Sequence, residues 1–233
     1  MKNIPIWQYD ESKHPGEDFD IEAEIYDDKV RKFRDIRKEN EELLSILNLQ
    51  PDQIVLEIGA GTGEFALAAA RQCLKVIAVD TSSGMLRLAD NKARSMGIEN
   101  IEFIQSGFLT YDCKEPVDVA VSLMSLHYLP DFWKQIALFR LSKMTKEGAT
   151  LLIKDSVYSF DIANYVEFFN CGLSRMASSV GTDSADWAAS HIKEEHSTLN
   201  WIMEGMIKRA GFRIEKYDYM LGMYATYLCT KVP

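Results

Sequence analysis

The chain has 233 residues, of which 47% are hydrophobic and 26% charged, and its formal net charge is −9 at pH 7. This length fits one large domain with a full core. The acidic balance argues against a broad nucleic-acid footprint and against attachment to an anionic membrane surface. The four cysteines are spaced too widely for a metal-binding knuckle, and no signal peptide or run of membrane-spanning length is found. We therefore expect a cytoplasmic protein that binds neither membrane nor nucleic acid.

The N-terminal 20 residues are acidic and aromatic without helical periodicity. Trp7 and Tyr9 lie in this segment, and disordered tails are poor in such residues. We therefore expect an arm that folds over a site. Apolar residues at helical spacing then predict a single helix over residues 21–47.

The most informative stretch follows, where the apolar run Ile54–Ile58 leads into a turn with glycines at alternate positions and then into helix-forming residues. Strand, glycine turn and helix open a nucleotide-binding βαβ unit, and the glycines let a ligand lie against backbone N–H groups. A second strand, 75–80, ends in Asp80, 21 residues after Gly59. An acid at this position can accept hydrogen bonds from both hydroxyls of a ribose.

The remaining elements alternate between strands and helices, which predicts a doubly wound parallel sheet with helices on both faces. Residues 156–197 interrupt this alternation with two expected helices and a small-residue joint. An antiparallel hairpin is expected around Leu221 and Gly222. The predicted helices are 82–96 (capped by Ser82 or Ser83), 131–143 and 199–210 (capped by Ser197 or Thr198), and the predicted strands are 100–105, 117–122, 148–154, 212–219 and 224–230.

The glycine turn, Glu57-Ile58-Gly59-Ala60-Gly61-Thr62-Gly63, resembles the first motif of class I S-adenosylmethionine-dependent methyltransferases. The run from Ser122 to Asp131 resembles the segment after the fourth motif in the small-molecule branch of that family. A dinucleotide fingerprint would need glycine where Glu64 stands. The resemblance implies a Rossmann-like, seven-stranded sheet whose last strand is antiparallel. It implies one domain over 1–233, with an N-terminal arm and helix (1–48), a cofactor-binding core (49–155), a helical lid insertion (156–197) and a C-terminal helix and hairpin (198–233).

The same resemblance implies S-adenosylmethionine as cofactor and assigns its binding residues. They are Glu57, Gly59, Ala60, Gly61, Thr62, Gly63, Asp80, Thr81, Met85, Gly107, Phe108, Leu123 and Tyr26. One position departs from the family, because Gly107 stands where an acid usually recognises the adenine amino group. Backbone groups of Gly107 and Phe108, Gln105, water or Asp112 are the alternatives for that role.

The segment after the fourth strand contains His127, for which two roles stay open. It lies at the carboxyl end of a strand, where α/β proteins bind ligands, so it is a candidate catalytic base. It is equally a candidate structural histidine that fixes the loop to the following helix. Tyr9, Tyr128, Glu195 and His196 are candidate substrate-binding residues. We predict no metal site, since His191 and His196 do not share a helical face.

Together these features predict methyl transfer to a small-molecule acceptor by direct in-line displacement beneath an aromatic lid. Methylation of a protein or RNA is one alternative, and a cofactor-binding or partner module without turnover is another. The acceptor and the oligomeric state are not identified, and a homodimer is one of the states that the sequence permits.

Overall fold

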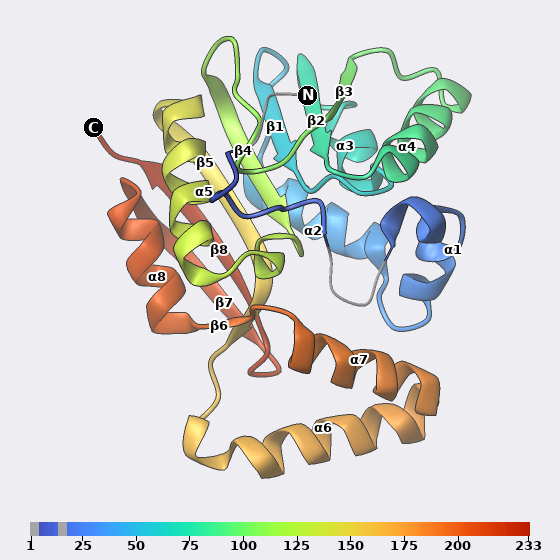
Figure 1. Cartoon of the computed structure of the whole chain (residues 1–233). Helices are drawn as coiled ribbons and strands as arrows, with labels where there is room; N and C mark the ends of the chain where they lie inside the picture. The colour runs from blue at the N-terminus through green and yellow to red at the C-terminus, as the bar shows by residue number, and fades with distance from the viewer. Residues whose placement is uncertain (1–4, 14–17) are drawn as a thin grey trace.

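The computed structural model describes residues 5–13 and 18–233. A twisted central sheet carries helices on both faces, and a pair of helices projects from one end of it (Figure 1). In the described part of the chain, no helix is both long and apolar enough to cross a membrane.

Two helices precede the first strand, α1 (Phe19–Arg31) and α2 (Ile36–Leu47). The prediction of one helix over 21–47 is therefore wrong. The reason is local, because the Asp35 carboxylate accepts a hydrogen bond from the Lys38 N–H and begins a new helix at that point. An N-terminal cap of this kind stabilises a helix start by about 1 kcal/mol.

The sheet has the strand order β3-β2-β1-β4-β5-β8-β7. Strands β1 to β5 are parallel to one another, and the last strand, β8, is antiparallel to both of its neighbours. The expected seven strands form this path, but a two-residue strand, β6, also pairs with the end of β5, which gives eight. The strands are β1 (Ile54–Ile58), β2 (Lys75–Asp80), β3 (Ile101–Gln105), β4 (Val117–Leu123), β5 (Thr145–Tyr158), β6 (Thr198–Leu199), β7 (Phe212–Met220) and β8 (Tyr224–Lys231).

The C-terminal hairpin forms as predicted, with its turn at Leu221 and Gly222. Both residues have positive φ, +57° and +70°. Two consecutive residues in this conformation match the right-handed twist of an antiparallel pair. Pairing with β8 from Thr150 to Ser156 also extends β5 well beyond the predicted 148–154.

Helices cover the two faces of the sheet with separate apolar clusters. Residues of α5 and α8 belong to one cluster, and residues of α2 and α3 belong to the other. The helices that follow α2 are α3 (Glu64–Ala69), α4 (Ser83–Ser95), α5 (Asp131–Met144), α6 (Tyr165–Val180), α7 (Thr182–Glu194) and α8 (Asn200–Arg209), and two short 3₁₀ turns occupy Leu126–Tyr128 and Ile162–Asn164.

Two predicted caps have different outcomes. Ser82 caps α4, as expected, by accepting a hydrogen bond from the Met85 N–H. The predicted cap of α8 by Ser197 or Thr198 is wrong, since Leu199 occupies that position without a side-chain bond. The Thr198 hydroxyl is instead 3.1 Å from Asp131 Oδ2 and ties β6 to α5.

The insertion after β5 consists of α6 and α7 joined at Gly181, as the sequence predicts. The two helices pack on each other and lie away from the sheet (Figure 1). Only Ala185 is buried among their residues. Trp187 of α7 packs against Phe33, which connects the insertion to the turn between α1 and α2.

Candidate functional site

The glycine turn after β1 exposes bare backbone at the edge of the sheet. Gly59 has φ of +82°, and a Cβ there would lie 2.3 Å from the Ser125 Cβ, so no other residue fits. Gly61 has φ of +52° and open space around it. The N–H groups of Gly59 and Ala60 donate to the Val79 carbonyl, which fixes the turn to the end of β2.

Asp80 at the tip of β2 is joined directly to this turn. Its Oδ2 accepts a hydrogen bond of 2.7 Å from the Gly61 N–H, and its Oδ1 accepts one of 2.9 Å from the Ser82 N–H. Burial raises the pKa of Asp80, and these N–H donors oppose that effect. Each oxygen keeps further lone-pair positions for a ligand.

Glu57 in β1 carries a polar atom without a partner. Its side chain is buried, and Oε2 has no hydrogen bond to any described residue. Burial raises the pKa of Glu57 well above its ordinary value, and the nearby Asp80 adds to the rise. A cationic or N–H-bearing ligand would satisfy this carboxyl, since a buried unsatisfied acceptor costs about 1–3 kcal/mol.

A cavity opens above these residues with about 1170 Å³ of empty space, part of it continuous with solvent. Its lining includes Glu11 and residues of α1, the turn after it, the glycine loop, the ends of β2 and β4, and the loop after β3.

Helix α1 covers one side of the cavity with aromatic rings. Phe19 packs edge-on against Tyr26 and Tyr128, with ring centroids 6.0 and 5.7 Å apart. Asp27 of the same helix accepts a 2.6 Å hydrogen bond from the Thr62 hydroxyl in the glycine loop. Lys92 of α4 lies 2.5 Å from Asp27 and so holds α1 over the loop.

The structure brings together almost all the predicted cofactor residues. Those that line the cavity are Glu57, Gly59, Ala60, Gly61, Thr62, Asp80, Thr81, Met85, Gly107, Phe108, Leu123 and Tyr26. Gly63 does not line it; this residue is the N-cap of α3, and a Cβ there would lie 2.8 Å from that of Ala89.

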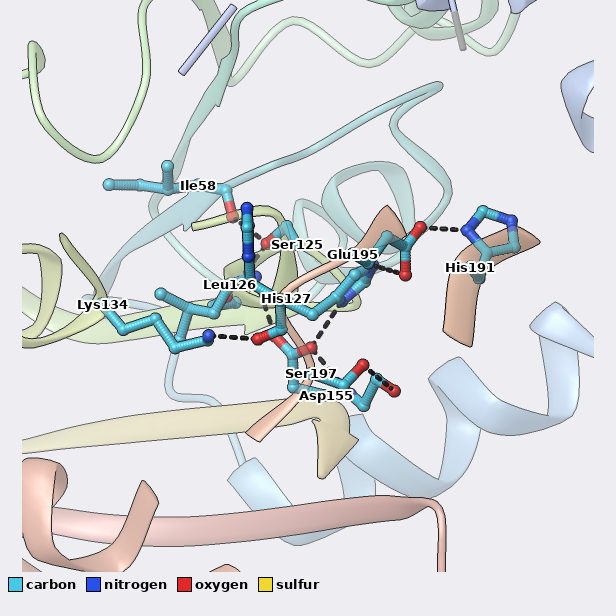
Figure 2. A network of polar contacts seen from close by, with 12 residues as sticks. Ile58, Ser125, Leu126, His127, Lys134, Asp155, His191, Glu195 and Ser197 are labelled. Atoms are coloured by element: carbon cyan, nitrogen blue, oxygen red, sulfur yellow. Dashed lines mark hydrogen bonds and ion pairs between the residues drawn. The ribbon is translucent and has the colours of Figure 1, made fainter. Parts of the chain in front are cut away.

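His127 lies outside the cavity lining, in a buried polar network (Figure 2). Its Nδ1 is 2.6 Å from Asp155 Oδ1, and its Nε2 is 3.4 Å from Glu195 Oε2. Burial lowers the pKa of His127, but the two carboxylates outweigh it and leave the pKa above its ordinary value. Glu195 also contacts His191 of α7.

The candidate substrate residues separate into two groups. Tyr128 lines the cavity, whereas Tyr9, Glu195 and His196 do not. Tyr9 donates a 3.3 Å hydrogen bond to the Tyr128 carbonyl, which docks the N-terminal arm. His196 donates from its backbone N–H to the His127 carbonyl, so Glu195 and His196 both connect the insertion to the loop after β4.

Sequence reasoning missed several residues of the cavity. Glu11 and Asp27 come from segments whose path over the core could not be deduced from local pattern. Met124 and Ser125 directly follow β4, and their position at a strand end was an available signal. Met124 has φ of +52°, and such a conformation in a non-glycine residue is common at functional sites.

Comparison with known proteins agrees with this geometry. A family model described as a methyltransferase domain matches residues 55–148. The carboxy-S-adenosyl-L-methionine synthase of Nautilia profundicola is 40% identical over 101 residues, 41% of this chain and 43% of that protein. An uncharacterised methyltransferase of Anoxybacillus flavithermus is 27% identical over 144 residues, 60% of this chain and 66% of that protein. The chain thus spans 43% and 66% of the lengths of these two relatives.

A solved structure shares the fold over nearly the whole chain. The S-adenosylmethionine-dependent methyltransferase of Clostridium acetobutylicum superposes with a TM-score of 0.68 at 16% identity, covering 92% of this chain and 99% of that one. The strand order, the reversed last strand and the glycine loop joined to an acid on β2 define a Rossmann-like nucleotide-binding domain. Residues 55–148 thus match a methyltransferase domain, and the chain resembles S-adenosylmethionine-dependent methyltransferases in sequence and in fold.

Proposed function

We propose that this protein transfers a methyl group from S-adenosylmethionine to a small-molecule acceptor. The hydrogen bond between the Gly61 N–H and Asp80 carries the proposal, because it builds the loop and the ribose-binding acid into one unit. Glu57 supports it with a buried oxygen that a cofactor ammonium group would satisfy. When bound, S-adenosylmethionine supplies an activated methyl group on a sulfonium.

The residues of the chain then bind the cofactor, orient it toward the acceptor and exclude water from the site. Gly59 and Gly61 hold the amino-acid end of the cofactor against backbone, and Asp80 holds the ribose. Positioning alone can account for a large part of the rate of a displacement between two bound molecules. The rings of Tyr26 and Tyr128 border the cavity and can stabilise a nearby positive charge.

The acceptor side of the cavity lies under α1 and its following turn. Tyr26, Val30, Ile36 and Met124 form the apolar part of its lining, beside Asp27, Arg31, Arg34 and Asn40. The apolar part supports a small acceptor with an aromatic or aliphatic body. Among the described residues, none of the 156–197 insertion lines the cavity. The aromatic cover in our proposal is therefore α1 with Tyr128, rather than α6 and α7.

His127 acts in this proposal as a positioning residue. Both ring nitrogens face carboxylates, and the imidazole does not line the cavity. It anchors the loop that carries Tyr128 to the end of the insertion.

Carboxy-S-adenosylmethionine chemistry, suggested by the name of one relative, has less support here. A carboxylate on the transferred group would need a cationic partner in the cavity. Arg34 makes a two-pronged contact with Glu39 at 3.0 and 2.8 Å, and Arg31 lies within 4 Å of Asp27, Asp28 and Glu64. Both arginines of the lining are thus matched with acids of the chain.

Calorimetric titration with S-adenosylmethionine and S-adenosylhomocysteine tests the proposal. Asp80→Ala should lower the affinity for both ligands by roughly 10- to 100-fold, which corresponds to the loss of one charge-assisted hydrogen bond. Asp90→Ala is the matched control, because Asp90 forms an ion pair with Arg94 on the surface of α4 and does not line the cavity. A folded wild-type protein that ignored both ligands but bound NADH would contradict the proposal.

Binding without turnover of any acceptor would instead favour a cofactor-binding module. A screen of phenols, thiols, amines and quinols against wild type and Asp80→Ala separates these outcomes. Methylation of protein or RNA in place of every small molecule would also contradict the proposed acceptor class.

A further inference from the structure

The loop after β3 leaves a gap at Gly107 that a residue from the other end of the sequence fills. A Cβ on Gly107 would lie 2.4 Å from Glu11 Cδ and 2.5 Å from its Oε2. The Glu11 carboxylate therefore stands where a side chain of residue 107 would begin. The φ of Gly107 lies outside the left-handed region, so crowding by Glu11, and not backbone strain, excludes a side chain there.

Hydrogen-bond donors of the loop after β3 hold the Glu11 carboxylate in this place. Its two oxygens accept hydrogen bonds of 2.9 and 3.0 Å from the Leu109 N–H, and Oε1 is 3.0 Å from the Thr110 hydroxyl. The side chain is buried, with 8% of the residue exposed, and lines the cavity. A carboxylate has about four acceptor positions, so Oε2 keeps capacity for a ligand.

The arm is anchored at two points shortly before Glu11. Gln8 donates to the Leu109 carbonyl at 3.3 Å, and Tyr9 donates to the Tyr128 carbonyl at the same distance. Arg140 of α5 in turn binds the Phe108 carbonyl at 2.9 Å and so fixes the loop that receives the arm. The position of the carboxylate is thus determined by several contacts.

A nucleoside bound along the glycine loop and Asp80 would place its base near Gly107. The glycine loop follows β1 and Asp80 ends β2, so a ligand with its tail on the first and its ribose on the second extends toward β3. Asp80 pairs in register with Gln105 of β3, and Gly107 lies two residues beyond. Thr81, Met85 and Phe108 line the cavity there.

Other candidate groups at this edge are occupied. The Gln105 amide donates to the Thr81 carbonyl at 3.1 Å. Asp112 lies 2.9 Å from Arg140 and does not line the cavity. Among the described acids of the lining, only Glu11 uses its carboxylate to bind the loop after β3.

We propose that Glu11, delivered by the N-terminal arm, accepts a hydrogen bond from the exocyclic amino group of the cofactor's adenine and thereby selects the base. This inference rests on the proposed function, because it requires an adenosine ligand with its ribose at Asp80.

The first measurement is calorimetric binding of S-adenosylhomocysteine to wild type, Glu11→Ala and Glu11→Gln. Loss of the acceptor should weaken binding to Glu11→Ala by roughly 10- to 100-fold. Gln8→Ala is the matched control, since it removes an anchor of the arm and leaves the carboxylate. It should weaken binding by less than about fivefold, as expected for one neutral hydrogen bond.

The second measurement uses S-inosylhomocysteine, in which a carbonyl oxygen replaces the amino group. Wild type should prefer the adenosyl ligand by at least about tenfold, because two acceptors would face each other in the inosyl complex. Glu11→Gln should narrow or reverse this preference, since its amide can donate to the oxygen. If the role of Glu11 were purely structural, its substitution would lower the affinity for both ligands equally.

A reciprocal variant restores the carboxylate from the other side. Gly107→Asp alone should bind poorly, because its Cβ meets Glu11. In Glu11→Ala/Gly107→Asp the space is free, and both affinity and base preference should return to within about fivefold of wild type.

The outcomes separate the two proposals. If wild type binds S-adenosylhomocysteine and Glu11→Ala keeps both its affinity and its base preference, the role of Glu11 is overturned and the cofactor assignment stands. Tighter binding by Glu11→Ala would also overturn it, since Glu11 would then obstruct the site. No binding by folded wild type overturns both.

Discussion

At the scale of single residues, Glu57 contributes in opposite directions to stability and binding. Its carboxyl is buried beside Asp80, and one oxygen lacks a partner among the described residues. The raised pKa means that the folded protein holds this proton more tightly than the unfolded chain does. Folding stability is therefore lost as pH rises from the unfolded pKa, about 4.3, through the folded value.

Glu57→Gln removes this charge without changing the shape of the side chain. We expect the ligand-free variant to be more stable than wild type at pH 8 by about 1–3 kcal/mol, or roughly 2–4 °C per kcal/mol in Tm. The difference should disappear near pH 4. Thermal unfolding across this pH range, together with titration of S-adenosylhomocysteine, measures both effects.

The same variant should bind S-adenosylhomocysteine roughly 10- to 100-fold more weakly, because a charged acceptor for its ammonium group is lost. Glu102→Gln is a suitable control, since Glu102 makes an exposed ion pair with Lys75 and such pairs contribute little. A Glu57→Gln protein that bound the ligand normally would show that the carboxyl serves only the fold.

At the scale of elements, His127 connects the loop after β4 to the end of α7. Asp155 on β5 and Glu195 after α7 hold the imidazole from two sides, and together they raise its pKa against the opposing effect of burial. The stabilisation from the charged imidazole is complete below its unfolded pKa of about 6.5. It is lost as pH rises through the higher folded value.

His127→Asn should therefore destabilise the protein most below pH 6.5, by about 3 kcal/mol, the lower end of the cost of breaking a buried charge pair. The deficit should shrink as pH rises toward 9. Thermal unfolding from pH 5.5 to 9 measures it, and His196→Asn is the control, because the backbone bond of His196 to His127 survives that change.

Binding of S-adenosylhomocysteine distinguishes the two roles considered for His127. A positioning residue outside the cavity should leave the affinity within about threefold of wild type, less than 1 kcal/mol. A variant of normal stability that had lost ligand binding or turnover would instead identify His127 as part of the reaction site.

The elements that sequence reasoning located correctly are those whose signals are local. Gly59 and Asp80 belong to one βαβ unit, and glycine spacing with a strand-end acid is enough to place them. The hairpin at Leu221 and Gly222 is also encoded in a few residues. The break after α1 was missed because Asp35, a short-range cap, lies inside an otherwise continuous helical pattern.

The parts that could not be predicted depend on contacts between distant segments. Glu11 and Leu109 are 98 residues apart, and no periodicity in either segment indicates that they meet. The sequence shows that glycine stands at position 107 in place of the usual acid, but it does not show which residue takes over the role of that acid. Likewise, His127 has the same local sequence whether it faces a substrate or two carboxylates, and the packing of β5 and of the segment after α7 decides between them.

At the scale of the whole molecule, the cavity is closed by the N-terminal arm and α1, whereas α6 and α7 form a separate unit. Glu11 and α1 both contribute to the lining, and no described residue of the insertion does. Ligand binding should therefore stabilise the two N-terminal segments and the glycine loop directly. The helical pair would be affected less directly, through the His127 network and through the contacts of Trp187 with Phe33 and Lys29.

Hydrogen exchange with saturating S-adenosylhomocysteine tests this division. At 100 times its dissociation constant the ligand should stabilise the fold by about 2.7 kcal/mol. Amides of residues 5–13 and 19–31 should gain protection, because local opening of these segments must release the ligand first. Amides of 165–194 should change little. Asp80→Ala at the same ligand concentration is the control, and its weaker binding should reduce the stabilisation to about 0.4–1.4 kcal/mol and reduce the protection accordingly. Strong protection of α6 and α7 in wild type would contradict this division and show that the insertion closes over the bound ligand.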